Sequence, residues 1–328
     1  MTRFPITGLA LAAALAACGG GGDDDDDGDD GSSDDGGLTT SPPEEVEMVT
    51  SGGFTDPMDA VASLDGSTFY FSAFTQEHPA QAAIFSVSAE GGDASVLAAG
   101  PPLENPAGLL VSADGGTLYI ADIGVRAGEL GDDAEESTQS VLYSMSISGG
   151  ALTAMSAAGI GEAAGLALAP DGDAIHVTGY NTAGQPGLFR VPAGGGAVED
   201  ILIGAPLESP SGVYVDSDAV SWVMDHHPSR GLGGALWAVT SQGEASEVVG
   251  NLGLSDPGGV SLVAGGGTAV IPNTTEDGEG QLTTVNIDSG EQTIVASPMK
   301  APAGIRTARE AGVFAIADSE GDAIYLAR

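Results

Sequence analysis

Acidic residues occupy one recurring place in this sequence, directly after a short apolar stretch. Asp122 and Asp318 end the sequences Tyr-Ile-Ala-Asp and Ala-Ile-Ala-Asp, and Asp225 ends Trp-Val-Met-Asp. Carboxylate oxygens arranged in a ring suit a hard cation such as Ca²⁺. Asp122, Asp225 and Asp318 are therefore candidate metal ligands. The alternative is that each aspartate accepts hydrogen bonds from backbone N–H groups at the end of a strand.

Other residues with useful chemistry fall near the same positions when the units of the chain are compared. His226 has an imidazole that, with a carboxylate, suits Zn²⁺ or an acid–base pair, and packing in a loop is the alternative. Because adjacent residues of an extended segment point in opposite directions, only one of His226 and His227 would serve a given site. The predicted ligand or partner face contains Asp59, Asp122, Tyr180, Asp225, His226, Asn273 and Asp318.

The element that must position these residues is a repeat. Each copy has a Pro, a Gly, an alternating apolar strand, an Asp-Gly type of turn and a second strand. Successive copies are 45 to 57 residues apart, and four short strands per unit at such a period are typical of a β-propeller. The copies are anchored at Asp59 (where the Gly is replaced), Gly108, Gly165, Gly212, Gly259 and Gly304.

The two ends of the repeat array indicate how the ring closes. The last unit stops at its third strand, Ile324-Tyr325-Leu326, whereas a strand without a unit, Val46-Glu47-Met48-Val49, precedes the first copy. Closure by this N-terminal strand removes the exposed sheet edges that an open array would leave. We therefore predict an all-β, six-bladed propeller over residues 44–328, with a seven-bladed ring containing one degenerate copy as the alternative.

Ser-x-Asp-Gly turns and Tyr-Ile-Ala-Asp strands make residues 46–328 resemble NHL-type and SMP-30/gluconolactonase-like six-bladed propellers. In lactonases of that family, Glu, Asn and Asp just before the blade Gly hold a divalent cation. Those positions here lack strong metal ligands. We therefore expect a module that binds a ligand or a protein, with no catalysis evident; the alternative is a metal-dependent lactonase-like hydrolase or lyase. The positions are Met58, Ala107, Ala164, Ser211, Gly258 and Ala303.

The charge of the chain limits its partners. The formal net charge is −39, with only 8 Lys and Arg residues against 47 Asp and Glu residues. Such a surface repels phosphate backbones, which argues against nucleic-acid binding. Cations or a basic partner are its natural complements, although high acidity also confers solubility. We expect a monomer. No cofactor is evident from the sequence, and bound Ca²⁺ is the alternative.

The N-terminus is interpreted as an address. Gly8 to Ala17 form an apolar segment of signal-peptide length, followed by Cys18, the only cysteine of the chain. Leu-Ala-Ala-Cys resembles the lipobox of bacterial lipoproteins, which implies a signal peptide at 1–17 and acylation of Cys18. An ordinary secretory signal is the alternative. The resemblance, with Gly19 following the cysteine, implies a lipid-anchored protein of the bacterial cell envelope, at the outer membrane.

The segment from 18 to 43 is expected to be a disordered linker. It consists mainly of Gly, Asp and Ser and contains too few apolar residues to form a core. Its carboxylates repel one another, and nothing in the sequence holds them in the tight loop that Ca²⁺ requires. We therefore interpret it as a spacer between the membrane and the propeller.

Overall fold

The computed structural model describes residues 41–124, 140–226, 233–253, 258–263, 265–275, 277–295 and 297–328. The predicted signal peptide and Cys18, the linker up to residue 40, and His227 lie outside these residues, so the predictions made for them are not addressed by the structure. Within the described residues, no helix is long and apolar enough to cross a membrane.

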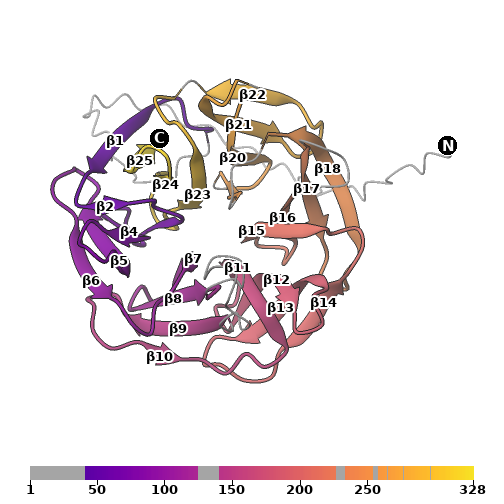
Figure 1. Ribbon diagram of the computed structural model, residues 1–328. Coiled ribbons are helices and arrows are strands. Elements are labelled where there is room, and N and C mark those ends of the chain that lie inside the picture. The colour runs from indigo at the N-terminus through magenta and orange to yellow at the C-terminus, as the bar shows by residue number, and fades with distance from the viewer. Residues whose placement is uncertain are drawn as a thin grey trace, which may run out of the picture. The chain divides into compact units, whose positions relative to one another are not determined.

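The described strands form six antiparallel sheets placed around a ring, as Figure 1 shows. The first blade contains β2 (Phe54–Thr55), β3 (Ala60–Ala62), β4 (Thr68–Thr75), β5 (Ala82–Ser88) and β6 (Ser95–Ala99). The second contains β7 (Pro106–Val111), β8 (Thr117–Asp122), β9 (Val141–Ser146) and β10 (Thr153–Ala154). The third contains β11 (Ile160–Leu168), β12 (Ala174–Asn181), β13 (Pro186–Pro192) and β14 (Glu199–Ile203).

The remaining blades repeat this order. The fourth contains β15 (Ser209–Val215), β16 (Ser221–His226), β17 (Gly234–Val239) and β18 (Ala245–Leu252). The fifth contains β19 (Ser261–Leu262), β20 (Thr268–Thr274), β21 (Gly280–Asn286) and β22 (Gln292–Val295). The sixth contains β23 (Pro302–Thr307), β24 (Phe314–Asp318), β25 (Ala323–Ala327) and β1 (Val46–Ser51). The predicted six blades are confirmed.

The ring closes through the strand that precedes the first repeat. β1 pairs antiparallel with β25, and Val46 lies opposite Ala327. The backbone N–H of Arg328 also donates to the carbonyl of Glu45, at 3.1 Å. In Figure 1 the indigo β1 lies beside the yellow β25. The predicted closure is confirmed, and it joins the two ends of the propeller through main-chain hydrogen bonds.

The core consists of layers between neighbouring blades. On β8, Leu118 and Ile120 pack against residues of the first blade, whereas Tyr119 and Ala121 pack toward the third blade. Successive side chains of a strand point to opposite faces of its sheet, and here both faces are covered. This explains why the second strands are almost continuous apolar runs. Packing on both faces also holds the channel-facing ends of the blades in place.

The Asp-Gly turns are held by the aspartate and serine side chains of the Ser-x-Asp-Gly sequence. Asp114 Oδ1 accepts hydrogen bonds from Ser112 Oγ at 2.6 Å and from the Gly116 N–H at 3.0 Å. Gly115 between them has a φ of 72°, which glycine adopts without steric strain. Hydrogen bonds to the charged form, that from Ser112 above all, lower the pKa of the Asp114 carboxyl.

His176 of β12 is a buried strand residue, and it makes folding depend on pH. It is 4 % exposed, and its Nδ1 lies 2.8 Å from Ser221 Oγ of the fourth blade. Burial, reinforced by the nearby Arg190 charge, lowers the pKa of His176 from 6.5 to about 4. Below pH 6.5 the unfolded chain therefore takes up a proton that the folded chain refuses, so stability is lost as the pH falls toward 4.

We expect this histidine alone to remove about 2 kcal/mol of stability when the pH is lowered from about 7 to about 5. Urea unfolding at both pH values, compared between the native protein and His176→Gln, measures it. The variant should lack this part of the acid destabilisation, while His78→Gln, at an exposed position, should retain it. Equal acid sensitivity of all three proteins would contradict the assignment.

Candidate functional site

The first strands of the blades meet at the neck of the central channel, where the repeat glycines lie. Gly212 N–H donates to the carbonyl of Gly258 in the next blade at 2.7 Å, and Gly259 N–H donates to Ala303 O at 3.1 Å. A Cβ atom on Gly212 would lie 2.4 Å from Gly258 O. The glycines are therefore required because the backbone of one blade contacts that of the next without room for a side chain.

Asp59 takes the place of this glycine in the first repeat, and its carboxylate is buried in the channel neck. Oδ1 accepts the Ala60 N–H at 3.0 Å, and Oδ2 accepts the Leu109 N–H of the second blade at 2.8 Å. Arg306 Nη2 lies 4.0 Å from Oδ2. Burial raises the pKa of Asp59, with the Arg306 charge opposing the shift.

Arg306 closes the channel from the sixth blade. Its Nη1 donates to Ile305 O at 2.8 Å, and its Nη2 donates to Leu166 O at 3.0 Å, in the third blade across the ring. The residue is 8 % exposed. Among the described residues, the void that Asp59 and Arg306 line in the neck measures about 10 Å³. The two mouths of the channel are thus separate sites.

Asp122, Asp225 and Asp318 occupy equivalent positions and hold the loops that lead into their own blades. Asp122 Oδ2 and Oδ1 accept the N–H groups of Glu104 and Asn105, at 2.8 and 3.0 Å. Asp225 accepts the N–H groups of Glu208 and Ser209, and Asp318 those of Lys300 and Ala301. In all three blades the acceptor lies within one residue of the end of the second strand, and the donors lie at the start of the first strand or directly before it.

These contacts correspond to the alternative weighed from the sequence. The three side chains are 0 to 3 % exposed. Within the residues that the structure describes, no three His, Cys, Asp or Glu side chains come together in a way that could hold a metal ion. Calcium binding by Asp122, Asp225 and Asp318 remains an untested prediction.

The strand register moves two residues out of the column to which the sequence comparison assigned them. Asp122 lies opposite Pro106, and in the third blade the matching partner of Ala163 is Gly179 and not Tyr180. Tyr180 comes one residue later, so its side chain projects to the other side of the strand. Phe74, which counting along the sequence places at the same position of the first blade, is displaced in the same way. Counting along the sequence aligned residues by their type. The face that a side chain occupies is instead set by the backbone pairing of the two strands.

The residues that directly follow the aspartate position on the second strands face the open mouth of the channel. A cavity of about 580 Å³ lies there, on the side of the ring that carries the inter-blade loops. Four of its lining residues each follow the aspartate position of their blade: Phe74, Ile123, Tyr180 and His226. Four others directly precede the blade glycine position: Met58, Ala107, Ala164 and Ser211. Alternation along the second strand was the signal that could have identified the first set.

The polar part of this pocket is acidic. Asp56 and Glu162 line it together with Asn105 and Ser209, and its described lining contains no Lys or Arg. Partial burial raises the pKa of Asp56, and the Asp322 carboxylate adds to the effect. Tyr180 is fixed at the wall because its hydroxyl donates to Glu208 O at 3.1 Å. The arrangement combines aromatic and apolar walls with carboxylates.

The other predicted face residues lie deeper. Asp59 is in the channel neck. Asn273 is 5 % exposed, and its Oδ1 accepts a hydrogen bond from Thr283 Oγ1 at 3.1 Å. Of the predicted face, Tyr180 and His226 line the pocket itself. Asp56, Ile123 and Ser209 also line the pocket and were not singled out from the sequence.

Six antiparallel sheets in a ring that β1 closes define the chain as a six-bladed β-propeller. No family model matches the sequence, and no curated protein matches it. Solved structures with the same fold include TolB from Acinetobacter baumannii, at 17 % identity and a TM-score of 0.56. That match covers 75 % of this chain and 55 % of TolB, so the chain spans about half of TolB's length.

In two further matches, a larger share of the solved structure's own chain is covered. A chain of the nidogen/laminin complex is 15 % identical, with a TM-score of 0.59 over 79 % of this chain and 88 % of that one. A protein described as a candidate gluconolactonase is 16 % identical, with a TM-score of 0.59 over 87 % and 91 %. At such identities the likeness concerns the fold.

Proposed function

We propose that this propeller is a binding module that accepts a cationic group in the pocket at the inter-blade mouth. The observation that carries the proposal is the composition of that pocket, where Asp56 and Glu162 stand beside Tyr180 and Phe74 in a cavity of about 580 Å³. Carboxylates at an aromatic wall attract an ammonium or guanidinium group through charge and through the ring faces.

The size of the cavity fits a small molecule or the side chain of a bound protein. Pockets for small ligands span about 300–1,000 Å³. The floor of this one is closed by Asp59 and Arg306, so an occupant enters from the loop side and stops at the neck. The chain's net charge of −39 draws cations toward it over a longer range.

We infer the location of the module from the sequence of its N-terminal segment. Acylation at Cys18 would anchor the propeller to the bacterial envelope, and the acidic linker would hold it away from the membrane surface. A basic amine or a Lys- or Arg-bearing segment of an envelope protein is the expected occupant. The known structures named above support the propeller fold of this proposal; the occupant rests on the pocket.

Fluorescence titration with two dansyl probes tests the charge preference. Dansylcadaverine carries a free amine, whereas dansylglycine carries a carboxylate on the same fluorophore. We expect the protein to bind dansylcadaverine in a salt-sensitive manner and to bind dansylglycine at least about tenfold more weakly. Glu162→Gln and Asp56→Asn should each weaken the amine probe severalfold; asparagine suits the φ of 52° at position 56.

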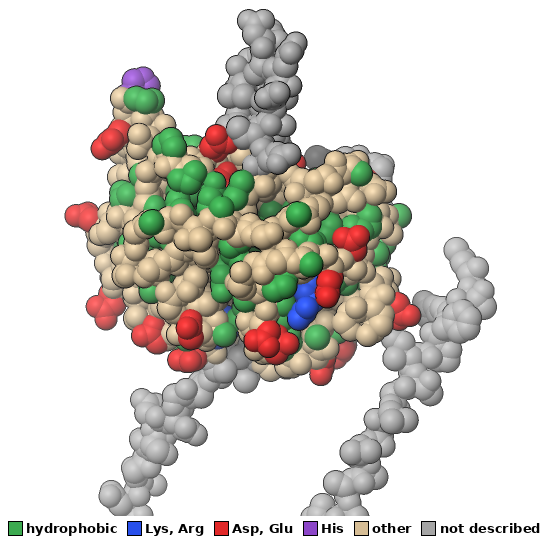
Figure 2. All heavy atoms as spheres, turned by 90° about the horizontal axis from the view of Figure 1, so that it is seen from below, with side chains coloured by type: hydrophobic (Ala, Val, Ile, Leu, Met, Phe, Trp, Pro, Cys, Tyr) green, Lys and Arg blue, Asp and Glu red, His purple; other side chains and the backbone are tan. Residues whose placement is uncertain are grey.

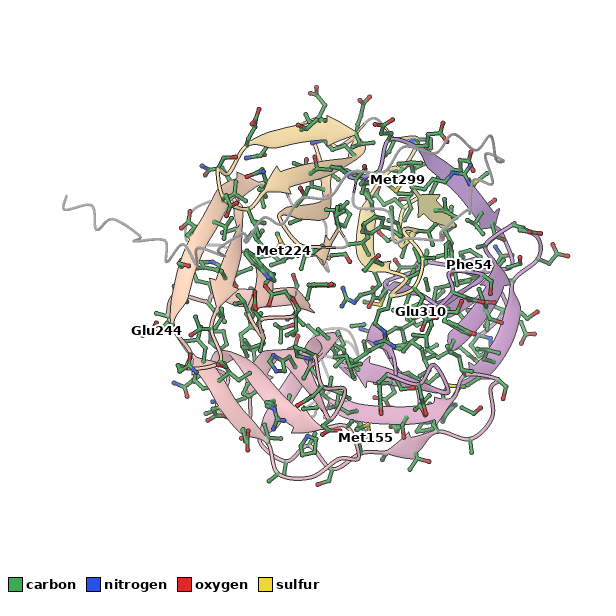
Figure 3. The ribbon with its side chains drawn as sticks, turned by 180° about the vertical axis from the view of Figure 1, so that it is seen from behind. Phe54, Met155, Met224, Glu244, Met299 and Glu310 are labelled. Atoms are coloured by element: carbon green, nitrogen blue, oxygen red, sulfur yellow. The ribbon has the colours of Figure 1, made fainter. Side chains whose placement is uncertain are left out.

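Glu244→Gln is the matched control, since it removes the same charge at an exposed residue that Figure 3 places on the outer edge of the ring. It should leave the binding of dansylcadaverine unchanged. If both probes bind equally, or if Glu244→Gln weakens binding as much as Glu162→Gln does, the signal reflects the overall charge of the protein and the proposed site is wrong.

A further inference from the structure

The opposite mouth of the channel contains a second pocket of different chemistry. It is about 100 Å³ in volume and lies on the far side of Arg306 from the acidic pocket. Apolar residues of four blades line most of it, among them Val61, Leu110, Leu168 and Val213. A cavity of about 150 Å³ accepts benzene in another protein, so this one has room for a short hydrocarbon group.

Two arginines line this small apolar pocket, Arg306 and Arg309. They are two of only 8 basic residues in a chain with 47 acidic ones. In Figure 2 acidic side chains are spread over the side in view, whereas basic side chains appear at few places. Two guanidinium groups at one apolar pocket are therefore a local reversal of the charge of the protein.

Arg309 is held in the hairpin between β23 and β24, which leans over the first blade. Its Nη1 donates to Val111 O at 3.1 Å, and its Nη2 donates to Ser112 O. Among the described residues it forms no ion pair. Burial is the main influence and lowers the pKa of Arg309, while Glu310, Tyr214 and Asp114 oppose that effect.

The carboxylates of the acidic neighbours of Arg309 do not lie in the pocket that the Arg309 side chain lines. Figure 3 places Glu310 near the inner edge of the ring, and its backbone N–H donates to Leu64 O at 2.8 Å. The carboxylate of Asp114 is used by its own turn, where it accepts hydrogen bonds from Ser112 and Gly116. Neither carboxylate lines the pocket.

Arg306 provides the second, independent observation. Its Nε atom is buried and has no hydrogen-bond partner among the described residues, although Nη1 and Nη2 are both engaged. Burying an N–H group without an acceptor costs the full free energy of desolvation, so proteins rarely leave such a group unsatisfied. Arg306 lines this pocket, so a carboxylate bound there brings an acceptor to its guanidinium group.

We propose that this second pocket binds a small organic anion, a carboxylate attached to a short hydrocarbon group. The hydrocarbon group packs against Val61, Leu110 and Val213, and the carboxylate accepts hydrogen bonds from the guanidinium groups of Arg306 and Arg309. Charge-assisted hydrogen bonds of this kind are about twice as strong as neutral ones. This pocket and the acidic pocket lie on opposite sides of Asp59 and Arg306. The proposal for this pocket therefore does not depend on whether the acidic pocket binds a cation.

Saturation-transfer NMR with three probes of equal chain length tests the proposal. Sodium hexanoate, 1-hexanol and hexylammonium chloride each have six carbon atoms in an unbranched chain and differ in the charge of the head group. We expect saturable binding of hexanoate and at least about tenfold weaker binding of the other two, since only the carboxylate is a charged acceptor. Equal binding of hexanoate and hexanol, or no binding of hexanoate at millimolar concentration, would overturn the proposal.

Variants locate the binding to this pocket. Arg309→Met should weaken hexanoate at least about tenfold and change hexanol little, because the side-chain stem is kept. Leu168→Trp, at a half-buried position of the lining, should block hexanoate without removing a charge. Arg190→Met removes an arginine that pairs with Glu199 on the outside of the third blade and is the matched control.

Thermal unfolding of each variant shows whether it is folded before binding is measured. If Arg309→Met does not fold, Leu168→Trp and Arg190→Met decide the question. Hexanoate bound equally by the native protein and Leu168→Trp would place the anion elsewhere and overturn the proposal. Loss of hexanoate binding in Leu168→Trp, with binding retained in Arg190→Met, would support it.

Discussion

Replacing Arg306 with methionine is expected to lower the free energy of unfolding by about 3–5 kcal/mol at about pH 7, which is the usual effect of removing one partner of a buried ion pair. The side chain joins the sixth blade to the third through Leu166 O and approaches the Asp59 carboxylate. Its loss leaves buried carbonyl groups without donors and a buried carboxylate without a cation.

The dependence on pH distinguishes this effect from a simple loss of packing. The pKa of Asp59 is already raised by burial, and loss of the Arg306 charge raises it further. In the Arg306→Met variant, the Asp59 carboxylate will therefore take up a proton as the pH falls. We expect the deficit in stability to be smaller at about pH 5 than at about pH 7, because a protonated carboxyl is less costly to bury.

Urea unfolding at the two pH values measures the effect, with Arg190→Met as the control. Arg190 forms an exposed pair with Glu199, and its removal should change stability by about 1 kcal/mol or less. A deficit for Arg306→Met that is equally small, or one that grows as the pH falls, would show that Asp59 and Arg306 do not act as a pair.

Replacing Gly212 with alanine is expected to destabilise the protein by about 3–4 kcal/mol, through overpacking and a weakened hydrogen bond between blades. The added Cβ would lie 2.4 Å from Gly258 O and 2.8 Å from Gly259 Cα. Both contacts are with backbone, so rotation of a side chain cannot relieve them. The fourth and fifth blades would have to separate, and the Gly212 N–H bond to Gly258 O would lengthen.

Gly194→Ala is the matched control for this prediction. A Cβ on Gly194 would meet nothing within 4 Å, and its φ does not lie in the left-handed region. Alanine there should leave stability unchanged or raise it slightly, because the unfolded chain becomes less flexible. Differential scanning calorimetry of the two variants compares them directly. Similar melting temperatures for both would mean that the blades do not contact each other as closely as the structure shows.

The repeat in the sequence was sufficient to predict the number of blades and the closing strand. Both depend on local patterns, since a turn at Asp114-Gly115 or an unpaired strand at Val46 can be recognised from neighbouring residues. Trp222 and Trp237 lie in such apolar strands and are buried, at 7 % and 6 % exposed. Alternating apolar residues need no knowledge of distant contacts to be read in this way.

The site was harder to predict because a shift of one residue along a strand changes the face that a side chain occupies. Tyr180 and His226 were chosen from the sequence and do line the acidic pocket, whereas Asp122 and Asp318, from the preceding column, hold backbone N–H groups. Polar residue types alone do not separate a residue that faces a cavity from one that stabilises a loop.

The sequence by itself determined the propeller, its six blades and the glycine at the start of most of them, because these follow from periods and turns within about fifty residues. It also showed that Asp59 breaks the glycine column. Only the tertiary structure showed why. Asp59 in the first blade approaches Arg306 in the sixth, and Arg306 reaches the third across the channel. Such contacts depend on ring closure, which brings residues 140 or more positions apart into one place.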